Sequence, residues 1–434
     1  MEYPVSTVDD AYKVCNPEQP LKDLNDPRYV DLTEVRGIRN VARTIAKRIV
    51  RTAPEFHQQL VTGHRGCGKS TELYRLKAQL ESDKFFTIYM DVEEMLDLGE
   101  VSYLDILLGI ARATEEQLRD NGFTLNKEML EELSDWFAEK VLIQETKHNR
   151  ESRAKAEAKI GTQIPFLATL LAKFTSEIRS GSSQREELRK TLEKELSVFI
   201  GHLNKLISAA RLQVQKHDFK DLVIIVDGLE KMHYRELPDG QSTHAALFVH
   251  HAEQLKAPKC SIIYTVPISL VSNANFMDAF PAESIVIPMV KYTTEQGQTK
   301  LIEVIAKRVK IDKVFNSLDL VEQLIKKSGG AVRDLMHLVR IACEGDDIIT
   351  QDDVKQAILT LDREFDRLVR EDDIDILLQV SQQKKVLADE KYARLLQLRL
   401  ILEYQNGHRW ADLHPAIQAS NLVKIKKQLE QFAK

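Results

Sequence analysis

One short segment limits the possible folds of this chain more than any other feature, and it is Gly63-His64-Arg65-Gly66-Cys67-Gly68-Lys69-Ser70. It lies between strand-forming residues at 58–62 and a run at 71–81 whose apolar residues recur at helical spacing. The glycines allow backbone N–H groups to turn inward around an anion, and the start of the following helix favours negative charge. The segment therefore predicts a strand, a phosphate-binding loop and a helix in succession.

The pattern GxxxxGK[ST] also predicts separate roles for the last two residues of this loop. Lys69 is placed to neutralise phosphate oxygens, and Ser70 is placed to bind Mg²⁺. The alternative is a tight glycine turn that leaves the lysine exposed. Cys67 fits a small loop residue, with an oxidation switch as the alternative. The residues expected to contact the phosphates are Gly63, His64, Arg65, Gly66, Cys67, Gly68, Lys69, Ser70 and Thr71.

Composition favours helices over other secondary structure. The 434 residues include only 17 glycines and 12 prolines, where average usage gives about 30 and 22. A β-sandwich or a loop-rich scaffold needs more turn residues than this. The hydrophobic share of 43% supports folded domains, and the length predicts two or three of them.

Charge and cysteine content exclude several other classes of protein. The chain has 61 basic and 66 acidic residues and a net charge of −5, which is not the strongly positive charge of a protein that coats nucleic acid. A local basic patch is compatible with this charge. The four cysteines form no CxxC pair and are expected to be reduced thiols. The acidic start lacks the apolar stretch of a signal peptide, and no apolar run approaches the ~20 residues of a membrane span. We therefore expect a cytoplasmic protein without a membrane partner.

Further apolar runs predict four more strands. They are residues 85–92, 222–226, 261–266 and 284–287. Helical patterns alternate with these runs, so we expect a parallel sheet covered by helices. Residues from about 101 to 217 show almost no strand pattern, which predicts a large helical insertion. After Pro288 the chain is helical again, and Asn406-Gly407 predicts a hairpin near its end.

Two acidic residues follow the most continuous apolar run. Asp227 ends this run, and Glu230 comes three residues later. Ligands of parallel sheets bind at the carboxyl ends of the strands, so both carboxylates are expected near the phosphate loop. Asp227 is placed to support Mg²⁺, and Glu230 is placed to orient a water for attack on a γ-phosphate. The alternative for Glu230 is a surface helix cap beside Lys231.

Residues 63–70 and 222–227 resemble the Walker A and Walker B motifs of P-loop NTPases. A further strand is predicted between the two motifs. In this respect the chain resembles the additional-strand division of P-loop NTPases, which includes the AAA+ and STAND ATPases. This resemblance implies ATP and Mg²⁺ as cofactors, and an α/β fold with five parallel strands in the order 5-1-4-3-2. Asp227-Gly228-Leu229-Glu230 looks like the STAND form, because AAA+ ATPases have a glutamate directly after the aspartate. The departure implies slow hydrolysis.

The second half of the chain resembles the origin-recognition and helicase-loading group of AAA+ proteins. Residues 293–308 are similar to the start of their helical lid. Ser328–Asp334 is similar to their sensor-2 segment, in which Arg333 would contact the γ-phosphate and would act with Lys69 and Glu230 in catalysis. The alternative for Arg333 is an ordinary helix turn with an exposed arginine.

The same resemblance implies roles for residues outside these motifs. Thr265 occupies the sensor-1 position, and no arginine finger follows it in residues 269–280. Tyr29 and Val30 lie where prokaryotic ATP-binding proteins have an adenine-contacting segment. We therefore expect these two residues to bind the base.

The resemblance further implies three domains and a general function. The domains are a P-loop ATPase core at 1–290, an α-helical lid at 291–370 and a small winged-helix-like domain at 371–434. The implied function is an ATP-hydrolysing regulatory or signalling switch, which forms an ATP-dependent homo-oligomer or binds an effector protein, by analogy in anti-phage defence. The alternative is a DNA-binding ATPase of the helicase-loader type, and a small-molecule P-loop kinase is a third.

Weaker signals each have a plain structural alternative. The basic stretch at 147–159 fits either nucleic-acid contact or a solvated helix face, and Ile164–Phe174 fits a partner-binding helix or internal packing. His250-His251 lacks a third metal ligand. The hairpin that carries Arg409 fits DNA contact or simple packing.

Overall fold

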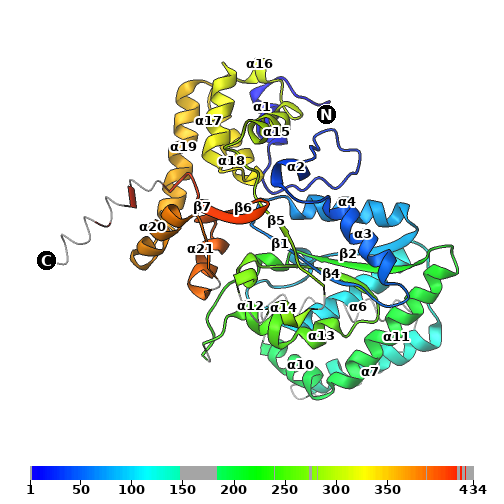
Figure 1. Ribbon diagram of the computed structural model, residues 1–434. Coiled ribbons are helices and arrows are strands. Elements are labelled where there is room, and N and C mark those ends of the chain that lie inside the picture. Colours follow the sequence, from blue (N-terminus) through cyan, green and yellow to red (C-terminus); the bar gives the residue numbers. More distant parts are fainter. Residues whose placement is uncertain are drawn as a thin grey trace.

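The computed structural model describes residues 2–146, 183–238, 240–272, 276–280, 282–387 and 389–417, together with 421, 422 and 426. At its centre lies a sheet of five parallel strands in the order β2-β3-β4-β1-β5 (Figure 1). The strands are β1 (Gln58–Gly63), β2 (Phe85–Asp91), β3 (Asp221–Asp227), β4 (Ser261–Val266) and β5 (Ile285–Ile287). The predicted fold class and strand order are confirmed.

Helices cover both faces of the sheet, which explains why β3 is apolar along its whole length. Val223 and Ile225 of β3 share a core with α3 and α4. Ile224 and Val226 point to the opposite face and share a core with α6, α11 and α13 (Figure 1). These helices are α3 (Val41–Thr52), α4 (Lys69–Ser82), α6 (Tyr103–Asp120), α11 (Leu196–Gln215) and α13 (Ala252–Lys256).

The described residues between 101 and 217 are helical, as the sequence predicts. Two further helices of this region are α7 (Lys127–Thr146) and α10 (Ser183–Lys194). Arg189 of α10 donates to the buried Asp105 carboxylate of α6, with 3.1 Å between Nε and Oδ1, which joins the two helices. The predicted basic stretch at 147–159 and the apolar stretch Ile164–Phe174 lie outside the described residues.

The helices after β5 form a bundle that includes the N-terminal helix. Apolar side chains of α1 share a core with α17 and α18, and Val5 exchanges backbone hydrogen bonds with Arg308 and Lys310. The first residues of the chain therefore pack with this α15–α19 bundle, although the predicted core domain spans 1–290. The helices are α1 (Val8–Val14), α15 (Glu295–Ala306), α16 (Ile311–Val314), α17 (Leu318–Ser328), α18 (Val332–Ala342) and α19 (Gln351–Asp366).

The C-terminal hairpin lies between the bundle and the sheet (Figure 1). The strands β6 (Ile401–Asn406) and β7 (His408–Leu413) pair antiparallel around Gly407, as predicted. Leu402 and Glu403 are neighbours in β6 and are both buried, so both faces of the strand are covered. The reason is packing on two sides: Glu403 O accepts from Met289 N (3.0 Å), and the Tyr404 hydroxyl donates to Gly329 O (2.7 Å).

This packing bears on the predicted DNA contact. A winged-helix hairpin that enters DNA projects into solvent, whereas β6 is enclosed, and Arg409 forms an ion pair with Glu403. DNA contact by the hairpin and a winged-helix domain both stay predictions. The helices before the hairpin are α20 (Ile374–Gln383) and α21 (Ala393–Gln397). Shorter helices in the described chain are α2 (Thr33–Arg36), α5 (Val92–Met95), η1 (Leu229–Lys231), α12 (Thr243–Ala245), η2 (Ala246–His250), η3 (Ile268–Ser272), α14 (Phe276–Ala279), η4 (Glu371–Asp373) and η5 (Glu390–Tyr392).

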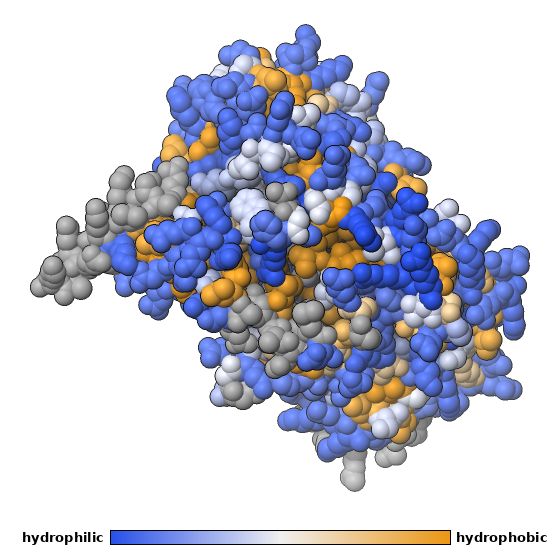
Figure 2. Space-filling model, viewed as in Figure 1, coloured by the Kyte–Doolittle hydropathy of each residue, from blue (hydrophilic) through white to orange (hydrophobic). Residues whose placement is uncertain are grey.

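The molecular surface is mainly hydrophilic on the face that Figure 2 presents, where apolar residues gather in small areas. Within the described part of the chain, no helix combines the length and the apolar character that a bilayer crossing requires. The apolar residues mostly fill the cores on the two sides of the sheet and inside the bundle.

A buried ion pair joins α18 to the C-terminal region and makes stability depend on pH. Asp334 is buried and accepts from Arg399, with 3.0 Å between Oδ1 and Nη2, and His414 Nε2 lies 3.3 Å from Oδ2. Burial alone would raise the pKa of Asp334, but the charges and hydrogen bonds of Arg399 and His414 together outweigh it and lower the pKa to about 2. Because the folded pKa is below the unfolded value, the stabilisation is present above pH ~4 and disappears as the pH falls toward 2.

We expect Asp334→Asn to lower the free energy of unfolding by about 2 kcal/mol or more at pH 7. The difference from the wild-type protein should shrink between pH 4 and 2, as chemical denaturation at several pH values would measure. The control is Asp352→Asn, which alters an exposed carboxylate paired with Lys355. An unfolding free energy with the same acid dependence in Asp334→Asn and wild-type protein would contradict this expectation.

Candidate phosphate-binding site

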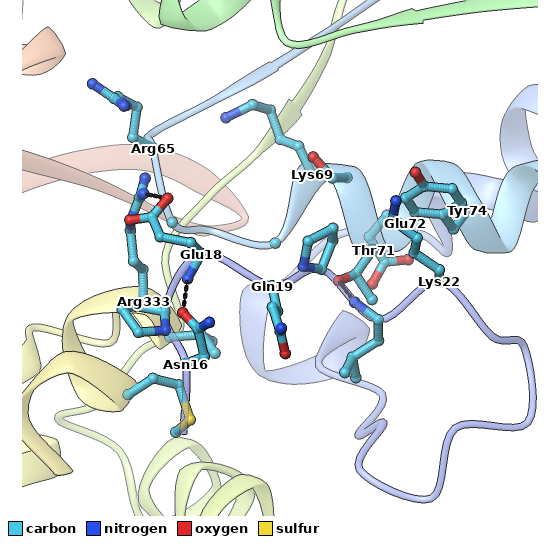
Figure 3. Close-up of a pocket in the computed structure, with 18 of the residues that line it drawn as sticks. Asn16, Glu18, Gln19, Lys22, Arg65, Lys69, Thr71, Glu72, Tyr74 and Arg333 are labelled. Atoms are coloured by element: carbon cyan, nitrogen blue, oxygen red, sulfur yellow. Dashed lines mark hydrogen bonds and ion pairs between the residues drawn. The ribbon is translucent and has the colours of Figure 1, made fainter. Parts of the chain in front are cut away.

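A cavity of about 590 Å³ lies where the phosphate loop, the ends of β2 and β3, and the α15–α19 bundle meet. An N-terminal segment, Asn16–Lys22, also lines it and crosses in front of the loop (Figure 3). Most residues predicted for the site line this cavity: Tyr29, Val30, Arg65, Gly66, Gly68, Lys69, Ser70, Thr71, Asp227, Glu230 and Arg333. Gly63, His64 and Cys67 belong to the same loop but do not line it.

Lys69 is buried at the start of α4 and points back into its own loop. Its Nζ donates to Gly63 O (2.9 Å) and to His64 O (3.0 Å), and it lies 3.3 Å from Glu230 Oε1. Burial alone would lower the pKa of Lys69, but the neighbouring groups, first among them the Glu230 carboxylate, together outweigh it and raise the pKa. The ammonium group is therefore charged at neutral pH and is placed to meet an anion in the cavity.

Asp227 ends β3 and lines the cavity together with Ser70, whose hydroxyl favours the ionised form of the carboxylate. Asp227 Oδ2 accepts from the Tyr89 hydroxyl (2.7 Å), and Oδ1 accepts from Gly228 N (2.9 Å). Burial, followed by the charge of Glu230, raises the pKa of Asp227 to about 6. The carboxylate is therefore mostly ionised at pH 7. Burial and the charge of Asp227 raise the pKa of Tyr89, so its phenol remains a donor.

Gly228 brings Glu230 into the cavity. Its φ of +99° lies in a region that residues with a side chain rarely adopt, so a glutamate directly after Asp227 would be strained here. The turn is held by Thr265, whose Oγ1 accepts from Gly228 N (2.9 Å) and Leu229 N (3.1 Å). Burial alone would raise the pKa of Glu230, but the charges of Lys69 and Lys231 and hydrogen bonds to the carboxylate together outweigh it and lower the pKa. Glu230 is thus a buried carboxylate and not the surface cap of the alternative interpretation.

Arg333 joins the bundle to the phosphate loop. Its backbone N donates to Gly66 O (3.2 Å), and a Cβ added to Gly66 would lie 2.3 Å from the Cβ of Arg333. Only glycine at position 66 therefore permits this approach. The Arg333 guanidinium forms an ion pair with Glu18 of the N-terminal segment (Figure 3). Burial, followed by the charge of Arg333, lowers the pKa of Arg65, so the loop faces two arginines together.

Arg36 and His64 make contacts around the loop that no sequence pattern predicts. The buried Arg36 donates to Cys67 O and lies 3.9 Å from Glu72 Oε1, which holds the loop against α2 and α4. His64 is fully buried, and its Nε2 accepts from Glu403 N (3.0 Å) of β6. Burial lowers the pKa of His64 to about 3, so the imidazole is neutral. His64 therefore binds the C-terminal hairpin rather than the cavity.

Part of the cavity wall is apolar. The Tyr29 ring, which lines the cavity, packs under the Arg75 guanidinium, with 3.7 Å between the ring centroid and Cζ. Six further lining residues belong to the core of the bundle or pack against it, and they are Val14, Val30, Leu32, Val304, Val332 and Met336. The cavity thus has an apolar region beside a charged region, as a nucleotide would require.

The oxygen ligands at the charged end fit Mg²⁺, which prefers carboxylates, hydroxyls and phosphates and keeps several waters. Ser70 and Asp227 supply a hydroxyl and an ionised carboxylate side by side. A cluster of three or more His, Cys, Asp or Glu side chains with metal-binding geometry is absent from the described residues. A metal here would therefore need phosphate oxygens and water as its remaining ligands.

Comparisons with known proteins give distant matches in structure only. No protein-family model matches the chain, and a search of curated proteins found no significant relative. A Walker-type ATPase of Pyrococcus abyssi is 14% identical, with a TM-score of 0.41, covering 95% of this chain and 99% of that one. The Orc1 protein of Aeropyrum pernix, solved in complex with DNA, is 13% identical (TM-score 0.41, 97% and 98% covered). Cdc6p of Pyrobaculum aerophilum is 13% identical (TM-score 0.40, 98% and 99% covered). Similarity at this level does not identify a function.

Proposed function

We propose that the chain binds ATP with Mg²⁺ in the cavity between the sheet and the α15–α19 bundle, and hydrolyses it slowly as a conformational switch. The observation that carries the proposal is the meeting of Lys69, Ser70, Asp227 and Glu230 in one cavity. A glycine turn with an exposed lysine would not bury Lys69 against a carboxylate.

In this proposal each residue has a separate task. Lys69 leaves the loop carbonyls and binds β- and γ-phosphate oxygens. Ser70 and Asp227 hold the metal, which neutralises phosphate charge when bound. Glu230 accepts a proton from the attacking water as the water oxygen binds the γ-phosphorus and the bond to the bridging oxygen breaks. ADP and inorganic phosphate leave, and the proton on Glu230 returns to solvent.

The α15–α19 bundle would act as the lid of the switch. Arg333 already contacts the phosphate loop through Gly66, so a γ-phosphate in the cavity would attract its guanidinium. Loss of this phosphate would release Arg333 and let the bundle move relative to the sheet. We place the boundaries of the lid near residues 290 and 370. We also propose that the chain forms a homo-oligomer when ATP is bound.

Two finer functions belong to this proposal. One is a DNA-binding ATPase of the origin-recognition type, which rests on the similarity of residues 293–308 and 328–334 to that group. The other is a regulatory or signalling switch. The signalling switch with an effector protein rests on the Gly228 position alone.

ATP turnover and oligomer size, each measured with and without duplex DNA, would separate the two candidates. Turnover stimulated by DNA would favour the origin-recognition type, and ATP-dependent assembly that ignores DNA would favour the signalling switch. Lys69→Ala and Glu230→Gln serve as inactive controls. Turnover that is unchanged in both variants would overturn the proposal.

Glu18 should compete with the nucleotide for Arg333. Its carboxylate pairs with the guanidinium that the γ-phosphate would need, although its side chain is 65% exposed. We expect Glu18→Gln to strengthen ATP binding about two- to fivefold, the scale of an exposed ion pair. Fluorescence titration with labelled ATP would measure it.

The control for this prediction is Asp23→Asn, which changes an acidic residue of the same region that does not line the cavity. The gain should vanish when Arg333 is also replaced by alanine, because the two side chains then no longer interact. Weaker ATP binding in Glu18→Gln would show that Glu18 helps to bind the nucleotide instead of competing with it.

A further inference from the structure

The end of β2 is bound directly to the end of β3. The two strands pair in parallel, with Tyr89 opposite Ile225 and Asp91 opposite Asp227. The Tyr89 side chain reaches across, and its hydroxyl donates to Asp227 Oδ2 (2.7 Å). With Gly228 N on Oδ1, each oxygen of the Asp227 carboxylate has a fixed donor, which sets the orientation of the group.

A residue of the helical insertion, Gln117, is hydrogen-bonded to the backbone of Tyr89. Strand β2 lies at the edge of the sheet, so one side of its backbone pairs with no strand among the described residues. There Gln117 of α6 supplies both hydrogen bonds: its Nε2 donates to Tyr89 O (2.7 Å), and its Oε1 accepts from Tyr89 N (3.0 Å). A side-chain amide thus replaces a neighbouring strand at this one residue.

The Tyr89 ring is fixed as well as its backbone. It stacks on Tyr74 of α4, with ring centroids 4.3 Å apart and an interplanar angle of 13°. Helix α4 begins at Lys69 and Ser70, so the ring lies between the helix that carries the phosphate ligands and the strand that ends in Asp227. The phenol therefore has little freedom to leave the carboxylate.

We propose that Tyr89 is a positioning residue for Asp227, and that Gln117 of the helical insertion fixes Tyr89, so that the insertion controls the geometry of the metal ligand. This inference rests on the proposed function, because it assigns Asp227 to Mg²⁺. Groups that orient a metal ligand typically change metal affinity 10- to 100-fold when removed. Tyr89 itself does not line the cavity.

The test is the Mg²⁺ concentration that gives half-maximal ATP turnover, measured at saturating ATP in the full chain. We expect Tyr89→Phe to raise it about tenfold. Nucleotide binding in EDTA should stay unchanged, because Lys69 and the loop are intact. Gln117→Ala should shift the half-maximal concentration in the same direction by a smaller factor.

The matched control is Tyr264→Phe, which removes a buried phenol from the same sheet. The hydroxyl of Tyr264 donates to Leu255 O (2.8 Å), away from the cavity. It should lower stability about as much as Tyr89→Phe and leave the Mg²⁺ requirement unchanged. Equal Mg²⁺ requirements in Tyr89→Phe and Tyr264→Phe would overturn the role of Tyr89.

The other outcomes are also decisive. An unchanged Mg²⁺ requirement in Gln117→Ala would overturn the role of the insertion, and Gln117→Ala alone carries the test if Tyr89→Phe does not fold. Failure of the proposed function looks different, since ATP binding would then persist in Lys69→Ala. Failure of this inference leaves ATP binding dependent on Lys69.

Discussion

Replacing Lys69 with alanine is expected to weaken ATP binding about 100-fold or more and to reduce turnover to background. The Lys69 ammonium is charged and buried, and it has neutral loop carbonyls and one carboxylate as its partners. In the bound state it would exchange these for phosphate oxygens, and charge-assisted bonds to two phosphates account for a loss of this size. Equilibrium titration with labelled ATP would measure the affinity.

Lys69→Ala is also expected to lower the free energy of unfolding, and this effect must be measured separately from the loss of ATP affinity. Without Lys69, the carboxylate of Glu230 is buried beside Asp227 without its cation, and breaking a buried pair typically costs about 3–5 kcal/mol. The double variant Lys69→Ala/Glu230→Gln removes both charges. We expect it to regain thermal stability but not ATP binding. A folded Lys69→Ala variant that binds ATP as tightly as the wild-type protein would contradict the assignment.

Glu230→Gln is expected to keep ATP binding and to lower turnover 100-fold or more. The amide has the same shape but cannot accept a proton from water, and general base catalysis typically contributes 10²- to 10⁴-fold. The charge of Lys69 keeps the pKa of Glu230 below its ordinary value, so the carboxylate is ionised at neutral pH. Single-turnover hydrolysis with bound ATP would measure the chemical step separately from binding.

The control for Glu230 is Glu115→Gln, which alters a largely buried acid of α6 that pairs with Arg119 and does not line the cavity. It should leave turnover unchanged. If turnover survives in Glu230→Gln, another carboxylate must activate the water, and Asp91 at the end of β2 lines the same cavity. That result would remove Glu230 from the mechanism without removing the ATP site.

The fold and the charged end of the site could be predicted from local sequence. Continuous apolar runs indicate strands that are covered on both faces, and β3 is such a strand. A parallel sheet collects the carboxyl ends of its strands at one edge, which is why Lys69 and Asp227 were expected to meet. The glycines of the loop predicted that its backbone N–H groups bind a phosphate.

The remaining contacts could not be predicted, because they join residues that are distant in sequence and carry no pattern of their own. No sequence pattern distinguishes Tyr89 from other strand tyrosines, and only the structure shows its hydrogen bond to Asp227. Glu18 lies in a polar segment without periodicity, and its approach to Arg333 depends on how the N-terminal segment crosses the cavity. The enclosure of β6 depends on Gly329, which accepts from the Tyr404 hydroxyl, and on His64, which accepts from the Glu403 backbone.

Calorimetric titration of ATP with Mg²⁺ into the full chain tests the central claim most directly. The account predicts one site per chain, competition by ADP for the same site, and loss of binding in the Lys69→Ala/Glu230→Gln variant, whose fold the second change protects. No heat of binding at millimolar ATP, or a site that persists in this folded double variant, would contradict it.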